Sequence, residues 1–203
     1  VVEKVTPTGT GDKTEGLQGQ VQEGKVTFTP GHDSVPFPAD STPLFDNGTT
    51  VKEVPNVGKF EVDADGIITF TPDKQYVGTP DPVTVKRVDK NGTEVTATYT
   101  PTVTKVTPTS TNAESSGIQG QPQKGTPTFN AGDPAVPIDL DRPMTFEDGQ
   151  STKTVSGVGV YAINSDGSIT FTPDKQYVGT PDPVTVKRVD KNGTEVTATY
   201  TPT

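Results

Sequence analysis

The chain has 203 residues, a net charge of −9 and no cysteine. The lack of cysteine excludes disulfides, thiolate metal sites and cysteine nucleophiles, and the acidic balance of both halves argues against a nucleic-acid-binding surface. No apolar run approaches the ~18 residues that a membrane span needs. Valine outnumbers leucine by 26 to 3 and threonine is abundant, and β-branched residues favour strands over helices. The composition therefore predicts an all-β protein.

The chain contains an internal repeat with an offset of 101 residues. Ile68–Thr102 is identical to Ile169–Thr203, and the residues before these blocks align without a gap although they have diverged. A repeat of about 100 residues has the size of a whole domain rather than of a solenoid unit. We therefore predict two tandem domains, residues 1–101 and 102–203, with a latitude of several residues at the boundary.

The first predicted strands of each domain are short. In the first copy Lys25–Thr29 alternates polar and apolar residues, with Val26 and Phe28 on one face. Ser34–Phe37 and Thr50–Val54 are weaker candidates. The many prolines between these segments fit edge strands and loops, where no ladder N–H is lost.

Two hairpins follow in each copy. Lys59–Val62 is expected to pair with Ile67–Thr71 across the turn DADG, and Val83–Val88 with Thr93–Thr100 across DKNG. Both turns end in glycine, which accepts a positive φ cheaply. In the last strand the inward-facing residues are expected to be Val95, Ala97 and Tyr99, with polar residues between them facing water.

This spacing of strands and turns predicts the architecture. Seven or so short strands in about 100 residues are typical of an immunoglobulin-like or fibronectin-like β-sandwich. The junction at Tyr99–Pro108 contains no glycine, and Pro101 and Pro108 favour extended backbone. Such a connection resists bending, so we expect two β-sandwich domains arranged end to end as an elongated rod.

No catalytic arrangement is shared by the two copies. His32 is the only histidine and its counterpart is Asp133, so a Ser-His-Asp triad is not available in the second copy. The carboxylates of Glu61 and Asp63 both have uncharged counterparts, which removes a common general acid–base pair. We predict that His32 is a surface residue, that the protein is not an enzyme, and that catalytic, cofactor-binding and metal-binding residues are all absent.

Two short motifs have a binding interpretation and a turn interpretation. The DADG sequence at 63–66 resembles the opening of a calcium loop, but the later glutamate is missing because position 72 is proline. A hairpin turn is preferred, and weak calcium binding stays open. The glycosylation acceptor N-x-T occurs at Asn47, Asn91 and Asn192, and these sequences are also ordinary turns, which is the preferred interpretation.

Glutamine and tyrosine residues leave two further alternatives. GLQGQ at 16–20 recurs as GIQGQ at 117–121, and Gln18 and Gln119 could cap backbone groups or form an internal ester or amide cross-link. Tyr76 and Tyr177 could be exposed aromatic residues that bind a ligand. Packing of both rings over the end of the sandwich is the preferred interpretation.

Together these segments resemble the CshA-type fibril repeat. The pattern includes G-[LI]-Q-G-Q, I-T-F-T-P-D, Y-V-G-T-P-D-P-V-T-V and D-K-N-G-T-x-V-T-A-T-Y-T-P-T, and it covers nearly all of both copies. The identical blocks Ile68–Thr102 and Ile169–Thr203 carry the most specific part of the pattern. That family occurs in very long, cell-wall-anchored surface adhesins of streptococci and related Gram-positive bacteria.

The resemblance implies a stalk function and supplies no site residues. In such adhesins many repeats form a fibril, while a separate amino-terminal region captures ligands that include host fibronectin. It also implies export, sortase-type anchoring to the cell wall through another part of the parent chain, and a role in adhesion, biofilm or virulence. The expected partners are neighbouring repeats, the adhesive tip domain and, through the parent protein, a host matrix protein such as fibronectin. No cofactor, nucleic acid or membrane partner is expected. The alternative is that the repeats themselves bind a host protein, a glycan or one another.

Overall fold

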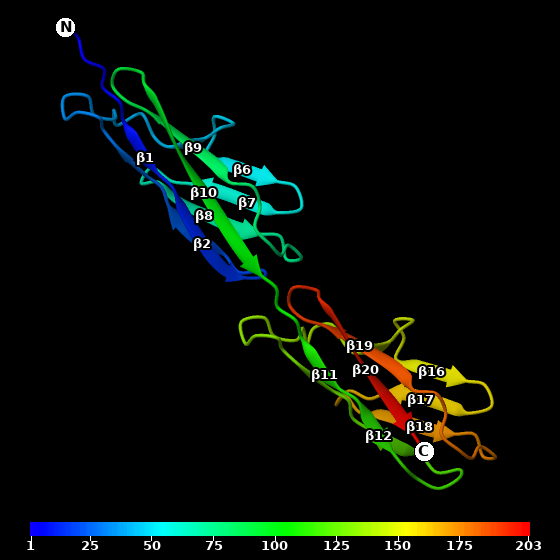
Figure 1. Cartoon of the computed structure of the whole chain (residues 1–203). Helices are drawn as coiled ribbons and strands as arrows, with labels where there is room; N and C mark the ends of the chain where they lie inside the picture. Colours follow the sequence, from blue (N-terminus) through cyan, green and yellow to red (C-terminus); the bar gives the residue numbers. More distant parts are fainter. The chain divides into compact units, whose positions relative to one another are not determined.

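The computed structural model describes all residues 1–203 and contains strands and no helix, which confirms the all-β prediction (Figure 1). The chain divides into two compact units, Val1–Lys105 and Val106–Thr203. No element is a helix with the length and apolarity of a membrane span. Each unit has ten strands rather than about seven, because several two- and three-residue pairings have no recognisable sequence pattern.

The first unit is a sandwich of two four-stranded sheets. One sheet has the order β2-β10-β9-β5 and the other β3-β8-β7-β6, and β1 pairs separately with β4. The strands are β1 (Thr8–Thr10), β2 (Asp12–Leu17), β3 (Gln22–Lys25), β4 (Thr27–Thr29), β5 (Leu44–Phe45), β6 (Val51–Val54), β7 (Gly58–Val62), β8 (Ile67–Pro72), β9 (Val83–Val88) and β10 (Glu94–Thr104).

The second unit repeats this topology. Its sheets have the orders β12-β20-β19-β15 and β13-β18-β17-β16, with β11 paired to β14. The strands are β11 (Thr109–Thr111), β12 (Ala113–Ser115), β13 (Gln123–Gly125), β14 (Thr128–Asn130), β15 (Thr145–Phe146), β16 (Thr152–Val155), β17 (Gly159–Ile163), β18 (Ile169–Pro173), β19 (Val184–Val189) and β20 (Glu195–Pro202).

Both predicted hairpins are present in the first unit. β7 pairs antiparallel with β8, and β9 with β10. The turns close as glycine requires, since Gly66 and Gly92 both have a φ of 82°. The first residue of each turn also caps it: the carboxylates of Asp63 and Asp89 each accept two backbone N–H groups at 2.9 Å. The Asx-type caps therefore fix the loops as firmly as the glycines do.

Two predicted strands differ from the structure. Lys25–Thr29 is split at Val26, whose N–H donates to the carbonyl of Gly66 at 3.0 Å, and the chain there passes from pairing with β8 to pairing with β1. Val26 and Phe28 nevertheless both pack against the core, as predicted. Ser34–Phe37 is not a strand, because it enters through a turn in which the N–H of Val35 donates to the carbonyl of His32, and the following Pro36 has no N–H to offer a ladder.

A parallel pairing that the sequence did not indicate closes one edge of the sandwich. β2 lies parallel to the second half of β10, from Tyr99 opposite Asp12 to Thr104 opposite Leu17. β9 has already ended there, and Pro101 faces the side that β9 has left, so the ladder needs no N–H from the proline. The predicted junction is accordingly shorter, because β10 includes Tyr99–Thr104 and only residues 105–108 separate it from β11.

The core lies between the two sheets of each unit. Val95, Ala97 and Tyr99 of β10 are buried and the intervening Glu94, Thr96 and Thr98 are exposed, which confirms the predicted alternation. Aromatic rings join the sheets, since the ring of Phe60 on β7 lies edge-on to that of Tyr99 at 6.2 Å between centroids. This packing of two inner faces is what defines a sandwich.

Candidate functional site

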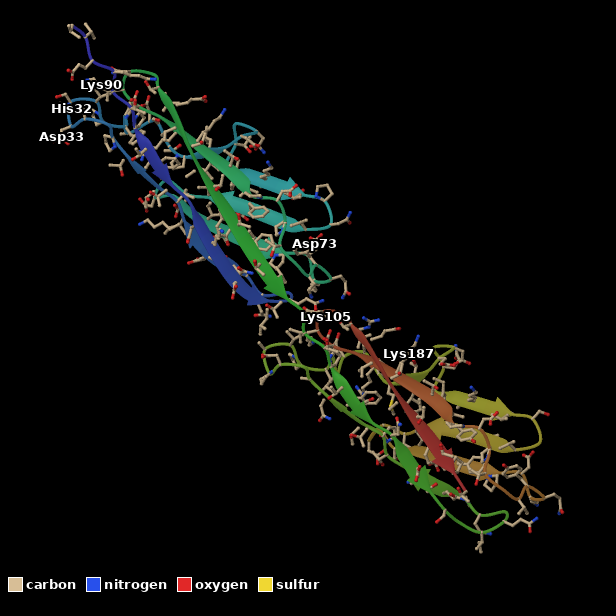
Figure 2. The ribbon with its side chains drawn as sticks, viewed as in Figure 1. His32, Asp33, Asp73, Lys90, Lys105 and Lys187 are labelled. Carbon is tan, nitrogen blue, oxygen red and sulfur yellow. The ribbon has the colours of Figure 1, made fainter.

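His32 has a role in shaping a turn. It is exposed, and its Nδ1 accepts the N–H of Ser34 at 3.1 Å. In the second unit the carboxylate of Asp133 accepts the N–H of Ala135 at 2.9 Å in the corresponding turn. Figure 2 shows His32 on the loop after β4, at one end of the first unit, and Asp73 towards the other end. The two unlike residues therefore perform the same local task, so the turn does not require a histidine.

The carboxylates of the β7–β8 hairpin are also accounted for locally. Glu61 pairs with Lys59 at 2.7 Å, and Asp63 caps the turn. The second unit has Asn164 in place of Asp63, and its amide donates to the hydroxyls of Ser168 and Thr170. The structure contains no group of three or more His, Cys, Asp or Glu residues arranged to hold a metal ion.

The three N-x-T sequences all lie in turns. The carbonyl oxygen of the Asn47 side chain accepts the N–H and hydroxyl of Thr49, and its amide donates to Val51. The backbone N–H groups of Asn91 and Asn192 donate to Asp89 and Asp190, each at 2.9 Å. The turn chemistry alone thus accounts for these sequences.

Gln18 and Gln119 occupy different environments although they belong to the same motif. Gln18 is buried, and its Nε2 donates to the carbonyl of Lys74 at 2.8 Å. Gln119 is exposed. Gln18 therefore caps a backbone group, whereas a cross-link common to both repeats would need the same surroundings in each.

Tyr76 and Tyr177 rest against the hydrophobic cores. Both rings are partly buried and pack on the core clusters of their own units. Burial raises the pKa of Tyr76, with a further contribution from the charge of Asp81. The preferred interpretation, in which these rings cover the end of the sandwich, agrees with this placement.

The polar side chains that both units share form a network inside the sandwich. The hydroxyl of Tyr99 lies 2.5 Å from that of Thr14, which donates to the Oε1 of Gln22, and the Nε2 of Gln22 donates to the carbonyl of Thr102 at 2.9 Å. Burial raises the pKa of Tyr99, an effect that its contact with Thr14 partly offsets. The network ties β2, β3 and β10 together.

The second unit contains the same network with one substitution. The hydroxyl of Tyr200 lies 2.6 Å from that of Ser115, which donates to Gln123, and the amide of Gln123 donates to the carbonyl of Thr203 at 3.0 Å. The sequence offered a signal that was missed, because the spacing Q-x-G recurs at Gln22 and Gln123. A network repeated in this way, between residues about 80 positions apart, is structural in both units.

A glycine beneath each tyrosine completes this arrangement. A Cβ on Gly24 would stand 2.3 Å from Cε1 of Tyr99, and a Cβ on Gly125 the same distance from Cε1 of Tyr200. No real side chain tolerates such a distance, so the tyrosine ring occupies the space of the missing side chain. This explains the retained glycine of Q-x-G in terms of packing.

Tyr161 is the one aromatic core residue with an unsatisfied polar atom. It takes the place of Phe60, is fully buried, and its hydroxyl has no hydrogen-bond partner. Burial, more than the nearby Tyr200, raises its pKa to about 12. The second core therefore contains a buried polar group that the first core lacks.

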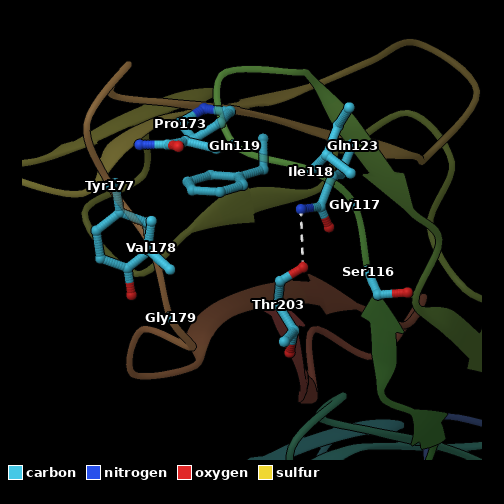
Figure 3. A pocket seen from close by; sticks show the side chains of 11 residues that line it. Ser116, Gly117, Ile118, Gln119, Gln123, Pro173, Tyr177, Val178, Gly179 and Thr203 are labelled. Atoms are coloured by element: carbon cyan, nitrogen blue, oxygen red, sulfur yellow. Dashed lines mark hydrogen bonds between the residues drawn. The ribbon is translucent and has the colours of Figure 1, made fainter.

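A groove of about 340 Å³ lies beside the end of β20 in the second unit (Figure 3). It is lined by the turn at 116–119, the loop at 177–179, and Phe171, Pro173 and Thr203. The N–H of Gly117 donates to the carbonyl of Thr203 at 2.9 Å. Two large apolar side chains of this region, Ile118 and Val178, are 75% and 76% exposed. The groove is therefore largely apolar and holds no assembled acid, base or nucleophile.

Comparison with known proteins points to one family. Residues 4–103 and 105–203 each match the family described as the surface adhesin CshA repetitive domain. Among solved structures, the chain is similar to repeat domain 13 of the fibrillar adhesin CshA from Streptococcus gordonii, with 68% identity over 34% of this chain and 90% of that chain and a TM-score of 0.21. No curated protein matches the chain.

The chain is also similar to tandem β-domains of other proteins. The I9–I11 tandem of titin is 14% identical, with 97% of this chain and 64% of that chain covered and a TM-score of 0.37. The EC1–4 segment of Drosophila N-cadherin is 12% identical, with 96% and 49% covered and a TM-score of 0.33. The chain thus covers less than two thirds of either of these solved segments.

Proposed function

The chain belongs to the CshA repetitive-domain family of surface adhesins, and on this basis we propose that its two units are stalk repeats of a bacterial surface fibril. In this function each repeat, 1–101 and 102–203 by sequence offset, adds length. The stalk holds an adhesive tip domain away from the cell wall, to which another part of the parent protein is anchored. Adhesion to host or other cells, through a matrix protein such as fibronectin, is then a property of the parent protein.

The observation that carries this proposal is the contrast between what the two units share and what they do not. They share the network of Tyr99 and Tyr200 with its glutamines and glycines, which serves packing. They do not share the side chains of His32, Glu61 or Asp63, which are the candidates for chemistry. A module whose function is length needs only the first kind of residue.

The short connection between the units also supports a stalk. Residues 105–108 contain no glycine and end in Pro108, and a connection of this kind restricts bending compared with a glycine-rich linker. The acidic charge of both copies further disfavours folding back of one unit on the other.

Small-angle X-ray scattering of the 203-residue chain tests the proposal. We expect a maximum dimension close to the summed lengths of two sandwiches. A matched variant with Thr107→Gly and Pro108→Gly should be more compact on average. A compact envelope for the unmodified chain would contradict a stalk function.

The alternative function, binding of a host protein or glycan by the repeats, has one observation in its favour, which is the apolar groove of Figure 3. Saturable binding of the chain to fibronectin that is lost on Tyr76→Ala with Tyr177→Ala would support it. Because both rings pack on the cores, the double variant must first retain its cooperative unfolding. Surface changes at Val51→Ser and Val160→Ser, two exposed valines outside the groove, provide a control that spares the cores.

A further inference from the structure

The turn that follows β4 in the first unit is closed by two hydrogen bonds to one residue. The backbone carbonyl of His32 accepts the N–H of Val35 at 2.9 Å, and its ring Nδ1 accepts the N–H of Ser34 at 3.1 Å. A backbone N–H can only donate, so Nδ1 must carry a free lone pair and the ring must be neutral. The bond to Ser34 therefore exists in only one protonation state of the imidazole.

The equivalent turn of the second unit has the same two bonds with a different side-chain acceptor. The carbonyl of Asp133 accepts the N–H of Val136, and its carboxylate accepts the N–H of Ala135, both at 2.9 Å. A carboxylate is ordinarily ionised throughout the range from about pH 5 to about pH 8, whereas an imidazole changes its charge within that range. Two turns with equivalent backbone geometry thus have caps that respond differently to pH.

The residues directly after the His32 turn connect it to the rest of the first unit. The carbonyl of Pro36 accepts the N–H of Lys90, in the turn between β9 and β10, at 2.9 Å. The ring of Phe37 lies edge-on to that of Phe28 on β4, at 6.3 Å between centroids. The guanidinium of Arg87 on β9 lies over the Phe37 ring, 4.7 Å from its centroid. A change of order in the turn is therefore felt by a segment that contacts two strands.

The charged groups near the turn do not favour one protonation state of the ring. His32 is exposed, and it forms no ion pair. The backbone of Thr6 lies against Gly31, so the segment before β1 also passes close to the turn. Figure 2 shows Lys90 at the same end of the unit as His32. The charged residues of these elements are two anions and two cations, namely Asp33, Glu3, Lys4 and Lys90. Loss of the Nδ1 acceptor is therefore the chief structural consequence of protonation.

We infer that His32 makes the turn at 32–35 a pH-sensitive element of the first unit. At pH 8 the neutral ring caps the N–H of Ser34. As the pH falls towards 5, Nδ1 takes up a proton from water and becomes a donor that faces another donor, so the bond is lost. The segment 32–37 then opens more often, while the equivalent segment 133–138 keeps its carboxylate cap. The inference concerns local order and does not rest on the stalk function.

Exchange of backbone amides with water, measured by NMR on the 203-residue protein between pH 8 and pH 5, tests the inference. Each rate is compared with that of an unprotected amide at the same pH, and the ratio is the protection factor. The protection factor of Ser34 should fall about threefold to tenfold at pH 5, the effect of losing one hydrogen bond, in step with the titration of the His32 ring protons. That of Ala135 should change by less than about twofold. Equal protection of Ser34 at both ends of the range would overturn the inference.

Two variants at the exposed position 32 separate the ring from its neighbours. His32→Asp copies the acceptor of the second unit, and the protection factor of Ser34 should then stay within about twofold between pH 8 and pH 5. His32→Ala removes the acceptor and should give, at every pH, the low protection that the unmodified chain has at pH 5. Retained pH dependence in His32→Asp would assign the effect to another group, such as Asp33. Full protection of Ser34 in His32→Ala at pH 8 would show that the ring does not order the turn. Either result would overturn the inference.

Discussion

The two units contain the same 35-residue block, yet the residues around that block give it two different environments. In the first unit Gln18 is buried and donates to the carbonyl of Lys74, while in the second unit Gln119, at the equivalent position, is exposed. The loops at 76–79 and 177–180 have identical sequences, yet Val77 is 41% exposed and Val178 is 76% exposed. The comparison shows that identical residues are buried to different extents according to the residues that surround them.

The cores differ in a second way, which lies in the diverged part of the repeat. Phe60 and Tyr161 occupy equivalent places and stack on Phe70 and Phe171 at 4.6 and 4.7 Å between centroids. The tyrosine adds a hydroxyl that finds no partner. The second unit therefore has a buried polar group where the first unit has a purely apolar contact, and this costs stability.

The largest losses of stability should come from removing the buried tyrosine that anchors the polar network in each unit. Tyr99→Ala and Tyr200→Ala each remove a fully buried ring, the anchor of the polar network and the contact with Phe60 or Tyr161. We expect each change to destabilise its own unit by about 3–5 kcal/mol, the usual cost of truncating a buried aromatic residue. Chemical denaturation combined with native-state hydrogen exchange would assign the loss to the correct unit.

Matched tyrosine-to-phenylalanine variants separate packing from hydrogen bonding. Tyr99→Phe and Tyr200→Phe keep the ring and leave the hydroxyls of Thr14 and Ser115 with their glutamine partners. Losses of about 1 kcal/mol are expected in both. A large loss in one unit and none in the other would show that the network is not equivalent in the two repeats.

An exchange of the equivalent residues Phe60 and Tyr161 should move the unpartnered hydroxyl, and its cost in stability, from the second core to the first. Tyr161→Phe removes the unpartnered hydroxyl and should stabilise the second unit by about 1–3 kcal/mol, and Phe60→Tyr should destabilise the first by a similar amount. Urea unfolding midpoints give both values. A destabilised Tyr161→Phe would mean that the hydroxyl has a partner, such as a bound water, in solution.

The pH dependence of stability should give independent evidence that the hydroxyl of Tyr161 is buried. The pKa of Tyr161 is raised to about 12 in the folded unit, so the unfolded chain loses this proton first, near a pKa of about 10. The titration of this hydroxyl leaves the free energy of unfolding of the second unit unchanged below pH 10, and lowers it as the pH rises from about 10 to about 12. The advantage of Tyr161→Phe over the unmodified chain should therefore grow by about 1 kcal/mol between pH 8 and pH 11. A constant advantage across this range would contradict the raised pKa.

Sequence reasoning found the features that depend on neighbouring residues. The hairpins of Asp65-Gly66 and Asn91-Gly92 were predicted because a positive φ at glycine is a local requirement. The alternation of Val95, Ala97 and Tyr99 was recognised for the same reason, since a strand with one buried face has a period of two.

Features that depend on distant partners were missed or misassigned. β2 has the sequence DKTEGL, with no apolar alternation, and it is a strand only because β10 offers an unpaired edge after Tyr99. Gln22 resembled any polar loop residue until Thr14, Tyr99 and Thr102 were placed around it. The split of Lys25–Thr29 likewise follows from a change of partner strand, and the residue pattern of a single segment gives no information about its partners.

The smallest expected effect is also the most direct measure of the difference at the ends of the two sandwiches. Gln18→Ala removes the hydrogen bond to the carbonyl of Lys74 from a buried site and should destabilise the first unit by about 0.5–1.5 kcal/mol. Gln119→Ala, at the equivalent but exposed position, should change the second unit by less than about 0.5 kcal/mol. Thermal unfolding of both variants beside the unmodified chain measures this asymmetry. Equal losses in the two variants would contradict the different environments of the two glutamines, one buried and bonded to a carbonyl and the other exposed.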